Sequence, residues 1–471
     1  MTQAFHLDRS PVVWARLIVG VAVAAAWIDC GRLHTLQNAD SILPVLVSVQ
    51  HWTPFFWGED RFGMLVPLLA MPIRNPFFNL LVQGWLTITA ALLAPFLAAR
   101  YIGADRYWIA AGALANACLL TIASPLIQFD WMVTQPYAVS MTLAFAALLL
   151  TDRDDAGWAA AVAAAALVIL AHWVNLTVCI VLVPLILARG GARARWQLSI
   201  TAAGVAGGAL FKLLSASSRT TTNVVPPGAW PHAWLQLLRM TWAGMSHPAG
   251  LIVLALIALI AAVLVSSDAG GRRSMRAAMT AGVGACAYWM VVGTFEHVQL
   301  NEYYARYIFP SLLLVAVATA LLIVAASRRP RAAAVMACAA LVGGAIFSDG
   351  VPSPRLVRKE MDRTIGVMTP AIEAAGATVV MGDYWTVWPA VFHANVARYE
   401  RTGRADIFGL TYRSDETDRE WISSARDHPV VIVAPRFDAS LDPLIARIGV
   451  PVTFIAVNGP ARVYIAGTRP E

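Results

Sequence analysis

Side chains able to do acid–base and phosphate chemistry gather in residues 30–75, between the first two long apolar stretches of the chain. Asp40 stands at the start of an apolar run that bears tryptophans. Further along come an acidic pair and a cation, Glu59, Asp60 and Arg61. An ionised carboxylate can take up a proton as a general base, and a guanidinium presents a rigid fork of donors that matches phosphate oxygens. This segment predicts proton transfer beside a bound phosphate, with Glu59 or Asp60 as a second catalytic acid.

A second dense polar cluster leads into a late apolar stretch, and its members are Glu296, His297, Asn301, Glu302, Tyr303, Tyr304, Arg306 and Tyr307. Among acidic and phenolic neighbours, Arg306 is a candidate for gripping a lipid phosphate. An arginine at a membrane boundary can also extend its charged end to the surface without any ligand. Both interpretations stay open.

The loop at 216–247 is a third source of cations. Lys212 lies just before it, and Arg219 and His247 lie within it, together with a threonine run and a proline pair. Such runs are ordinarily flexible connectors. The loop is also long enough to fold over a site, in which case these three side chains would join Arg306 and Arg61 in binding the phosphate.

The same residues have structural interpretations. Asp40 precedes an apolar run, where an aspartate commonly caps a helix. Glu59, Asp60 and Arg61 are adjacent opposite charges, which on a surface usually form a solvated turn of little energetic value. Asp130, in Gln-Phe-Asp-Trp at 128–131, is interpreted as a turn residue beside an aromatic membrane anchor.

The amino-acid composition indicates that most of this chain is surrounded by lipid. The chain is 58% hydrophobic and 13% charged, with a mean hydropathy of +0.63, which is typical of a protein surrounded by lipid and excludes an ordinary soluble enzyme. Its formal charge of +7 comes almost entirely from arginine. Because membrane orientation explains that charge, no nucleic-acid partner is expected. The five cysteines show no disulfide or zinc spacing.

A membrane-spanning helix needs about 20 apolar residues. One run of 32 residues, 157–188, is interrupted only by His172, Trp173 and Asn175. It is interpreted as two crossings, either a tight hairpin or a re-entrant pair. We therefore expect about eleven spans, at 11–29, 76–99, 107–124, 137–151, 157–171, 174–188, 197–215, 248–266, 277–295, 306–326 and 332–348.

Arginines fall mainly into alternate gaps between these spans. The gaps at 100–106, 152–155, 189–195, 267–276 and 327–331 hold twelve arginines in 33 residues, whereas the other five gaps hold five in 104. Arginine-rich gaps remain in the cytoplasm. The pattern therefore predicts that the N-terminus is inside and that the long, chemically varied loops and the C-terminus are outside.

The chain changes character near residue 350. Charge density rises, and short β-branched runs at 378–382, 429–434, 452–457 and 462–466 favour strands, whereas 355–375 and 416–426 favour helices. We expect residues 1–349 to form a transmembrane domain with catalytic outer loops, and 350–471 to form a small extracytoplasmic α/β domain. The overall fold class is thus a polytopic α-helical membrane protein with a small C-terminal α/β domain.

This layout resembles the GT-C fold glycosyltransferases. The resemblance rests on the aspartate after the first span, on Arg-Phe-Gly at 61–63 followed by Pro67, and on Arg-Tyr-x-x-Pro at 306–310. Gly-Asp-Tyr-Trp-Thr-Val-Trp at 382–388 is similar to a segment in C-terminal domains of such bacterial proteins. The common family pattern at the first position is an acidic pair, whereas this chain has Asp40-Ser41.

The resemblance implies a glycosyltransferase that moves a sugar from a polyprenyl-phosphate donor to an extracytoplasmic hydroxyl with inversion. Asp40 would be the general base, and arginine or lysine side chains would hold the leaving phosphate. His297, Tyr304, Tyr384 and Trp385 would contact the acceptor or the sugar. Trp388 could stack on the sugar with Tyr384 and Trp385, although buried tryptophans in a small domain more often belong to the core.

The partners implied are the lipid-linked sugar, membrane lipid, and a glycan, glycolipid or protein acceptor. The implied location is a bacterial inner membrane, with the active site facing the periplasm or exterior. A divalent cation, Mg or Mn, is the one cofactor for which the resemblance leaves room; the metal ligands stay unknown.

Two other functions fit a chain of many spans. A transporter or lipid flippase usually needs ionisable or helix-breaking residues near the middle of the bilayer, and the apolar stretches hold few of them. A non-catalytic assembly subunit would use the membrane part to present residues 350–471. Replacing Asp40 separates these functions from sugar transfer.

Overall fold

The structure is a computed structural model. It describes residues 11–31, 33, 36–57, 59–103, 107–152, 157–215, 223–245, 256–263, 269–327, 329–411, 430–432, 452–458 and 461–466. These residues divide into two compact units. The first consists of residues 1–28, 85–214 and 221–351, and the second of residues 29–84, 215–220 and 352–471.

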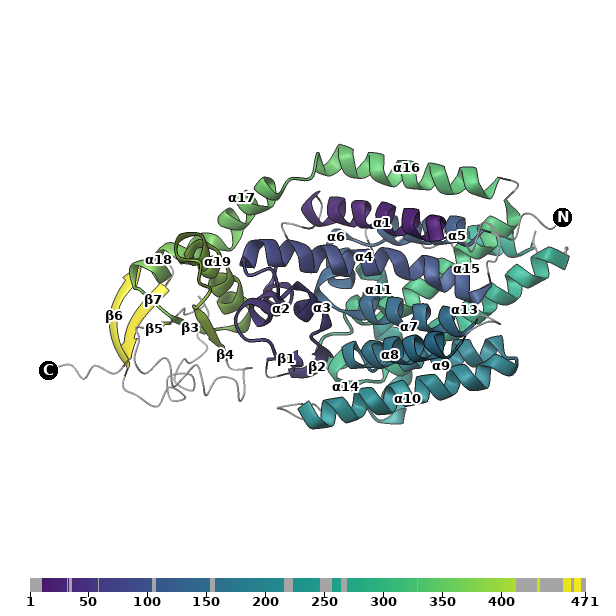
Figure 1. The fold of residues 1–471 in the computed structure, drawn as a ribbon, viewed down its shortest axis with the longest axis horizontal. Coiled ribbons are helices and arrows are strands. Elements are labelled where there is room, and N and C mark those ends of the chain that lie inside the picture. Colours follow the sequence, from purple (N-terminus) through teal and green to yellow (C-terminus); the bar gives the residue numbers. More distant parts are fainter. Residues whose placement is uncertain are drawn as a thin grey trace. The chain divides into compact units, whose positions relative to one another are not determined.

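The first unit is a bundle of helices (Figure 1). Within it α13 packs against α15 and α9, while α15 also packs against α5. The helices of this unit, three of which extend into the other unit, are α1 (Pro11–Gly31), α4 (Pro76–Ile102), α5 (Trp108–Ile122), α6 (Pro125–Phe129), the π-helix η4 (Asp130–Thr134), α7 (Tyr137–Thr151), α8 (Trp158–Val174), α9 (Val178–Arg189), α10 (Ala192–Ser215), η5 (Pro227–Ala229), α11 (Trp230–Ala243), α13 (Ala269–Gly293), α14 (Glu296–Leu300), η6 (Ala305–Ile308), α15 (Phe309–Ala326) and α16 (Pro330–Asp349).

Several of these helices suit a lipid environment. Among the described residues, five helices are long and apolar enough to cross a membrane, and six if the bent pair Pro125–Thr134 and Tyr137–Thr151 is one span. Ten of the eleven expected spans coincide with a helix, and the expected span at 248–266 is described only at 256–263. Since α9 has 12 residues, it would extend only about 18 Å. The number eleven therefore stays a prediction.

The run at 157–188 forms two helices, as expected. Helix α8 ends at Val174, and α9 begins at Val178 after a turn in which Asn175 Oδ1 accepts from both the amide and the hydroxyl of Thr177, at 3.0 and 2.8 Å. His172 Nδ1 lies 2.7 Å from the carbonyl of Val168. These contacts satisfy Asn175 Oδ1 and His172 Nδ1 at the break between the two helices, whereas the buried His172 Nε2 has no hydrogen-bond partner among the described residues.

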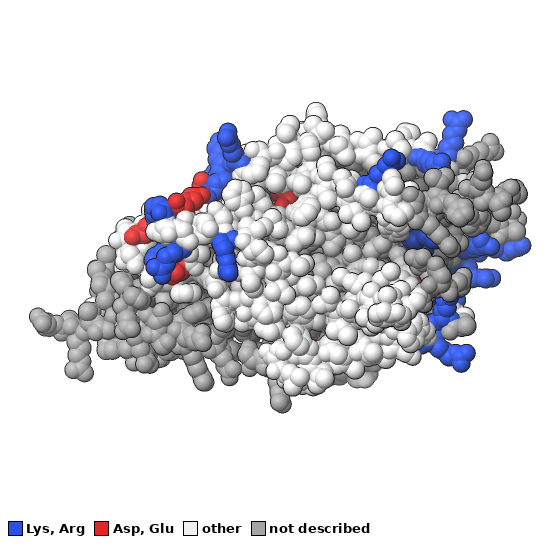
Figure 2. Space-filling view, viewed as in Figure 1, with Lys and Arg blue, Asp and Glu red and all other residues white. Residues whose placement is uncertain are grey.

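Arginines gather at one end of the helical unit. On the face shown in Figure 2, lysine and arginine side chains cluster where α4, α9 and α15 end and where α10, α13 and α16 begin. Asp152 links two of the gaps, because it binds Arg189 at 2.8 Å and its carbonyl accepts from Arg193 at 2.7 Å. This is the arrangement that the alternating arginine pattern predicts for the helix ends. The compartment that this end faces stays a prediction.

The second unit combines the segment after α1 with the C-terminal residues. Its sheet has the order β4-β3-β5-β7-β6, in which β3 is parallel to β4 and β5, and β7 is antiparallel to β5 and β6. The elements are α2 (Ala39–Val49), β1 (Phe55–Phe56), β2 (Glu59–Gly63), α3 (Leu65–Ala70), α17 (Pro354–Thr364), η7 (Gly366–Met368), α18 (Thr369–Ala374), β3 (Val379–Gly382), α19 (Tyr384–Thr402), β4 (Phe408–Thr411), β5 (Val430–Ile432), β6 (Val452–Asn458) and β7 (Ala461–Ala466).

Four of these strands, β3, β5, β6 and β7, confirm the expected strand positions, and α17 and α18 confirm the helical composition of 355–375. The predicted helix at 416–426 lies outside the described residues. Helix α19 was not expected. It begins after Asp383, whose carboxylate accepts from the amide of Trp385 at 2.9 Å, and it ends at Gly403, which has a left-handed φ of 72°.

Helix α2 is buried on nearly all sides. Ser48 Oγ donates to the carbonyl of Pro67 at 2.8 Å, and Asn79 Nδ2 donates to Ser48 Oγ at 2.9 Å. Gln83 Nε2 in turn donates to Asn79 Oδ1 at 2.7 Å and to the carbonyl of Pro44 at 3.2 Å. These bonds fix α2 against α3 and the first two turns of α4.

Candidate functional site

Asp40 lies in the first turn of α2, but it does not cap that helix. The cap is Asn38, whose Oδ1 accepts from the amide of Ser41 at 3.2 Å while Ser41 Oγ accepts from the amide of Asn38 at 3.0 Å. The interpretation of Asp40 as the cap is therefore wrong. Asn38 therefore satisfies the beginning of α2 without the carboxylate of Asp40.

Tyr384 forms a hydrogen bond with Asp40. Its hydroxyl donates to Asp40 Oδ1 at 2.9 Å, although the two residues are 344 positions apart. Both side chains are buried, with 6% of Asp40 and 3% of Tyr384 exposed. A buried carboxylate that accepts a phenolic hydrogen bond is held in one orientation, which is what a general base requires.

The packing of α19 on α2 creates this contact. Helix α19 buries Val387, Trp388 and Val391, and it contacts both α2 and the strands β3 and β4. At the other end of α2, Gln50 Nε2 donates to the carbonyls of Ala405 and Ile407 at 3.2 and 2.6 Å. Helix α2 is thus attached to the C-terminal segment at both of its ends.

The aromatic residues predicted to contact sugar divide into two kinds. Trp388 is 1% exposed and lies 6.0 Å from the ring of Trp57, so it belongs to the core. Trp385 is 46% exposed, and its ring lies 5.2 Å from that of Tyr384. Trp385 therefore offers a stacking surface directly beside the Asp40–Tyr384 pair.

Several other predicted residues are described only in part. Glu59, Asp60 and Arg61 form strand β2, which pairs with β1, and their side chains lie outside the described residues. Lys212 is half-buried in the last turn of α10. Arg219 and His247 also lie outside the described residues.

Arg306 sits in the short helix η6 of the first unit, surrounded by predicted partners. Its Nη2 donates to Asn301 Oδ1 at 3.1 Å and to the hydroxyl of Tyr307 at 3.0 Å. The guanidinium carbon lies 5.7 Å from the ring of Tyr304 and 5.0 Å from that of Tyr307. His297 meets the ring of Tyr307 edge-on at 5.4 Å. The structure therefore brings Arg306, His297 and Tyr304 together.

The backbone before Arg306 is strained. Glu302 and Tyr303 have φ values of 55° and 54°, a left-handed conformation that costs non-glycine residues on the order of 1 to 3 kcal/mol. The amide of Tyr303 donates to the carbonyl of Val298 at 2.8 Å, which holds the turn in place. Such strain persists only where the surroundings determine it, and it is typical of ligand sites.

Other loops of the helical unit converge on the same turn. The chain at 223–225 pairs with 294–296 in antiparallel fashion. Gly244 lies so close to Ile127 and Ala305 that an added Cβ would contact them at 3.2 and 3.4 Å. The segments before and after α6, α11 and α14 are thus assembled around the beginning of α15.

Asp130 is a residue whose contacts its sequence context did not indicate. It is 4% exposed and opens the π-helix η4, and it forms a hydrogen bond with Tyr304. Burial raises the pKa of Tyr304, and the Asp130 charge and hydrogen bond raise it further, while Arg306 lowers it. The phenol therefore stays protonated at neutral pH. The one sequence signal was an aspartate next to tryptophan in a gap without arginine.

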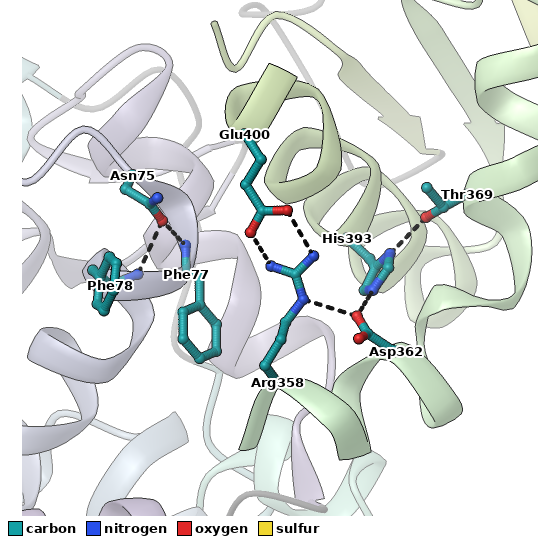
Figure 3. Close-up of polar contacts among 8 residues, drawn as sticks. All are labelled: Asn75, Phe77, Phe78, Arg358, Asp362, Thr369, His393 and Glu400. Atoms are coloured by element: carbon teal, nitrogen blue, oxygen red, sulfur yellow. Dashed lines mark hydrogen bonds and ion pairs between the residues drawn. The ribbon is translucent and has the colours of Figure 1, made fainter. Parts of the chain in front are cut away.

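A polar network lies on the outside of the C-terminal segment (Figure 3). Arg358 binds Glu400 at 2.6 and 3.1 Å and Asp362 at 2.8 Å, and Asp362 in turn contacts His393 at 2.8 Å. The other ring nitrogen of His393 is 2.7 Å from the hydroxyl of Thr369. An Asp–His–Thr row can relay protons, but Thr369 is buried, so this network serves to join α17, α18 and α19.

Titration of this network follows from its contacts. Burial lowers the pKa of His393, and the hydrogen bond to Asp362 only partly offsets it. Burial raises the pKa of Asp362, but hydrogen bonds from His393 and Arg358 outweigh that effect and leave its pKa below the usual value. His393 is therefore neutral at pH 7, donating to Asp362 and accepting from Thr369.

An apolar hollow of about 40 Å³ adjoins the π-helix in the first unit. Its lining includes Trp131, Met245, Leu312 and Val315. No group of three His, Cys, Asp or Glu side chains suited to a metal ion occurs in the part of the chain that the structure describes. Because Glu59 and Asp60 have no described side chains, the divalent cation stays a prediction.

Comparison with known proteins adds a structural likeness. No protein-family model matches the chain, and no curated protein matches its sequence. Among solved structures, the crystal structure of ArnT from Cupriavidus metallidurans bound to undecaprenyl phosphate is similar, with 13% sequence identity and a TM-score of 0.36 over 98% of this chain and 99% of that chain. At that identity and score, the likeness assigns neither a family nor an activity.

Proposed function

We propose that this chain is an integral membrane glycosyltransferase that moves a sugar from a polyprenyl phosphate to an extracytoplasmic hydroxyl. The acceptor is a glycan, a glycolipid or a protein, and the membrane is a bacterial inner membrane with the C-terminal segment on its outer side. Asp40 is the general base, and Arg306 binds the donor phosphate.

The observation that carries this proposal is the hydrogen bond from Tyr384 to Asp40 at 2.9 Å. It joins the carboxylate of the first loop to the aromatic segment of the C-terminal part. Both were candidate site residues for independent reasons, one for proton transfer and the other for sugar contact. A buried acid that served only the fold would need no exposed aromatic ring such as that of Trp385 beside it.

Each proposed residue has one task in the reaction. Asp40 accepts the proton of the acceptor hydroxyl while that oxygen forms a bond to the anomeric carbon. The bond from the anomeric carbon to the phosphate oxygen breaks on the opposite face, so the configuration inverts and the phosphate leaves with the electron pair. Arg306 stabilises the charge on the departing phosphate.

The surroundings of Arg306 support an anionic lipid as ligand. Its guanidinium offers a fork of donors suited to phosphate, and the apolar hollow at Trp131 lies on the same part of the first unit. Trp131 lines that hollow and also donates to the carbonyl of Ala305 at 3.3 Å. Trp131 thus joins the apolar hollow to the residue that precedes Arg306, and a cation near an apolar surface is suited to a phosphate with a hydrocarbon tail.

The test is transfer of labelled sugar from polyprenyl phosphate by purified full-length protein. Asp40→Asn should lower the rate by about 10² to 10⁴ without changing thermal unfolding. Asp383→Asn is the matched control, because Asp383 caps α19 next to Tyr384 and asparagine caps a helix equally well. Wild-type rates in a folded Asp40→Asn protein would remove Asp40 as the base.

A further inference from the structure

The chain between α6 and α7 contains a π-helical turn at a sharp bend. Residues Asp130–Thr134 form the turn, closed by the amide of Gln135 donating to the carbonyl of Asp130 at 3.1 Å. The segment that it ends, Pro125–Thr134, is bent by 59° relative to the next helix, Tyr137–Thr151. Single π-helical turns are less stable than α-helical ones and occur often at functional positions.

Asp130 holds Tyr304 from this turn. Its carboxylate is buried and forms a hydrogen bond with the Tyr304 hydroxyl, which stays protonated and donates. Thr134 Oγ1 donates to Asp130 Oδ1 at 3.2 Å and so orients the carboxylate from within the same turn.

Trp131 binds Ala305, the residue after Tyr304. Its indole Nε1 donates to the carbonyl of Ala305 at 3.3 Å, and its ring lies 5.6 Å from that of Phe309. Trp131 is 1% exposed, so this anchor is rigid. Two successive side chains of the π-helical turn, Asp130 and Trp131, therefore bind the two residues that precede Arg306.

Fixing Tyr304 also fixes the surroundings of Arg306. The Tyr304 and Tyr307 rings both lie within 6 Å of the guanidinium carbon, where a ring face attracts a cation. If the Tyr304 hydroxyl loses its partner, that ring can turn, and the guanidinium can adopt other rotamers. Binding of the ligand then has to confine the Arg306 side chain to one rotamer, and the entropy lost in doing so lowers the affinity.

We propose that Asp130 is a positioning residue that acts through Tyr304 to orient Arg306 toward the phosphate of the lipid donor. This inference rests on the proposed function, because it assigns that phosphate to Arg306. Asp130 itself has no step in the transfer reaction. It sets the affinity for the lipid phosphate and leaves the chemical step to other residues.

The experiment measures binding of polyprenyl phosphate without sugar to full-length protein in detergent, alongside sugar transfer. Asp130→Asn and Tyr304→Phe should each raise the lipid Kd and the donor KM by roughly tenfold, with kcat changed less than about threefold. Because both substitutions remove the same contact, the double variant should bind the lipid no more weakly than either single variant. Thr142→Val is the control, since it removes the hydrogen bond from Thr142 Oγ1 to the carbonyl of Ala90 at 2.7 Å in the following helix and leaves Asp130 and Tyr304 unchanged.

Three results would overturn the inference. The first is a fall in kcat for Asp130→Asn at unchanged donor KM, which would make Asp130 a catalytic residue. The second is a double variant whose loss is the product of the single losses. The third is wild-type lipid binding that neither variant weakens, which leaves the proposed function intact. Absence of lipid binding by the wild type would instead overturn the proposed function and this inference together.

Discussion

Asp40 is held by a hydrogen bond to a residue 344 positions away, whereas the described hydrogen bonds of Arg306 reach residues only one and five positions away. The first arrangement depends on two distant segments folding together. The second is built within one turn and its neighbouring loops. A local cluster of polar residues is visible in a sequence, but a carboxylate that acquires its partner only through the fold is not.

The comparison predicts that Arg306 variants act on the ligand and leave folding unchanged. Arg306→Ala should raise the donor KM by roughly 10- to 100-fold, because it removes charge-assisted hydrogen bonds. The donor KM of Arg306→Lys should lie between those of the wild type and Arg306→Ala, since lysine keeps the charge but lacks the forked donors of arginine. Arg239→Ala on α11 is the control, as Arg239 is exposed in the same unit. Steady-state kinetics at varied donor concentration measure these KM values. An unchanged donor KM in Arg306→Ala would show that Arg306 does not bind the phosphate.

The distant contact predicts a smaller, catalytic effect. Tyr384→Phe keeps the ring and removes the hydroxyl that orients Asp40, so transfer should slow by about tenfold. Tyr399→Phe, on the same helix and partly exposed, should be without effect. If Tyr384→Phe transfers sugar at the wild-type rate, the 2.9 Å hydrogen bond is a packing contact only.

Variants of Asn38, the cap of α2, test whether the position of Asp40 depends on where this helix begins. Asn38→Ala should destabilise the beginning of the helix by about 1 kcal/mol, whereas Asn38→Asp should be nearly neutral, because aspartate caps equally well. Amide hydrogen exchange over residues 39–49 measures the difference. Equal exchange in both variants would show that Asn38 does not determine where α2 begins.

The smallest effect concerns pH. Since the pKa of His393 is lowered in the folded protein, the unfolded chain binds more protons below about pH 6.5, and stability falls as the pH drops through that value. The lowered pKa of Asp362 contributes only at more acidic pH, where its carboxylate protonates. His393→Gln should flatten the dependence of thermal unfolding between pH 7 and 5.5. A variant with the wild-type slope would assign the dependence to other groups.

Much of the helical layout follows from the sequence alone. Apolar length predicted where the helices lie, because a helix in lipid must be apolar over its whole length. Four of the five described strands of the C-terminal sheet were also predicted, since β-branched runs bounded by polar residues favour strands, whereas β4 (Phe408–Thr411) was missed. Tertiary contacts were less accessible. Helix α19 was missed because Trp385, Val387, Trp388, Val391 and Phe392 are residue types that suit strands as well.

The candidate site was predicted in its residue types and only partly in its contacts. Asp40 and Arg306 were identified by chemistry, but the assignment of Asp40 as a helix cap was wrong, because the helix begins at Ala39 and Asn38, two positions before Asp40, is its cap. Asp130 was interpreted as a surface turn residue. Its burial depends on the π-helical turn and on Tyr304, and neither has a signature in a single sequence.

The amide and hydroxyl chain from Ser48 through Asn79 to Gln83 has a consequence for the order of folding. Apolar surfaces alone would let α2 slide by one turn along α4, but sliding would strand these buried polar groups, at roughly 1 to 3 kcal/mol each. The register of α2 is therefore decided by residues that the ribosome completes long before it reaches Tyr384. The nascent chain can seat Asp40 first, and the C-terminal segment then docks onto a carboxylate that is already in place.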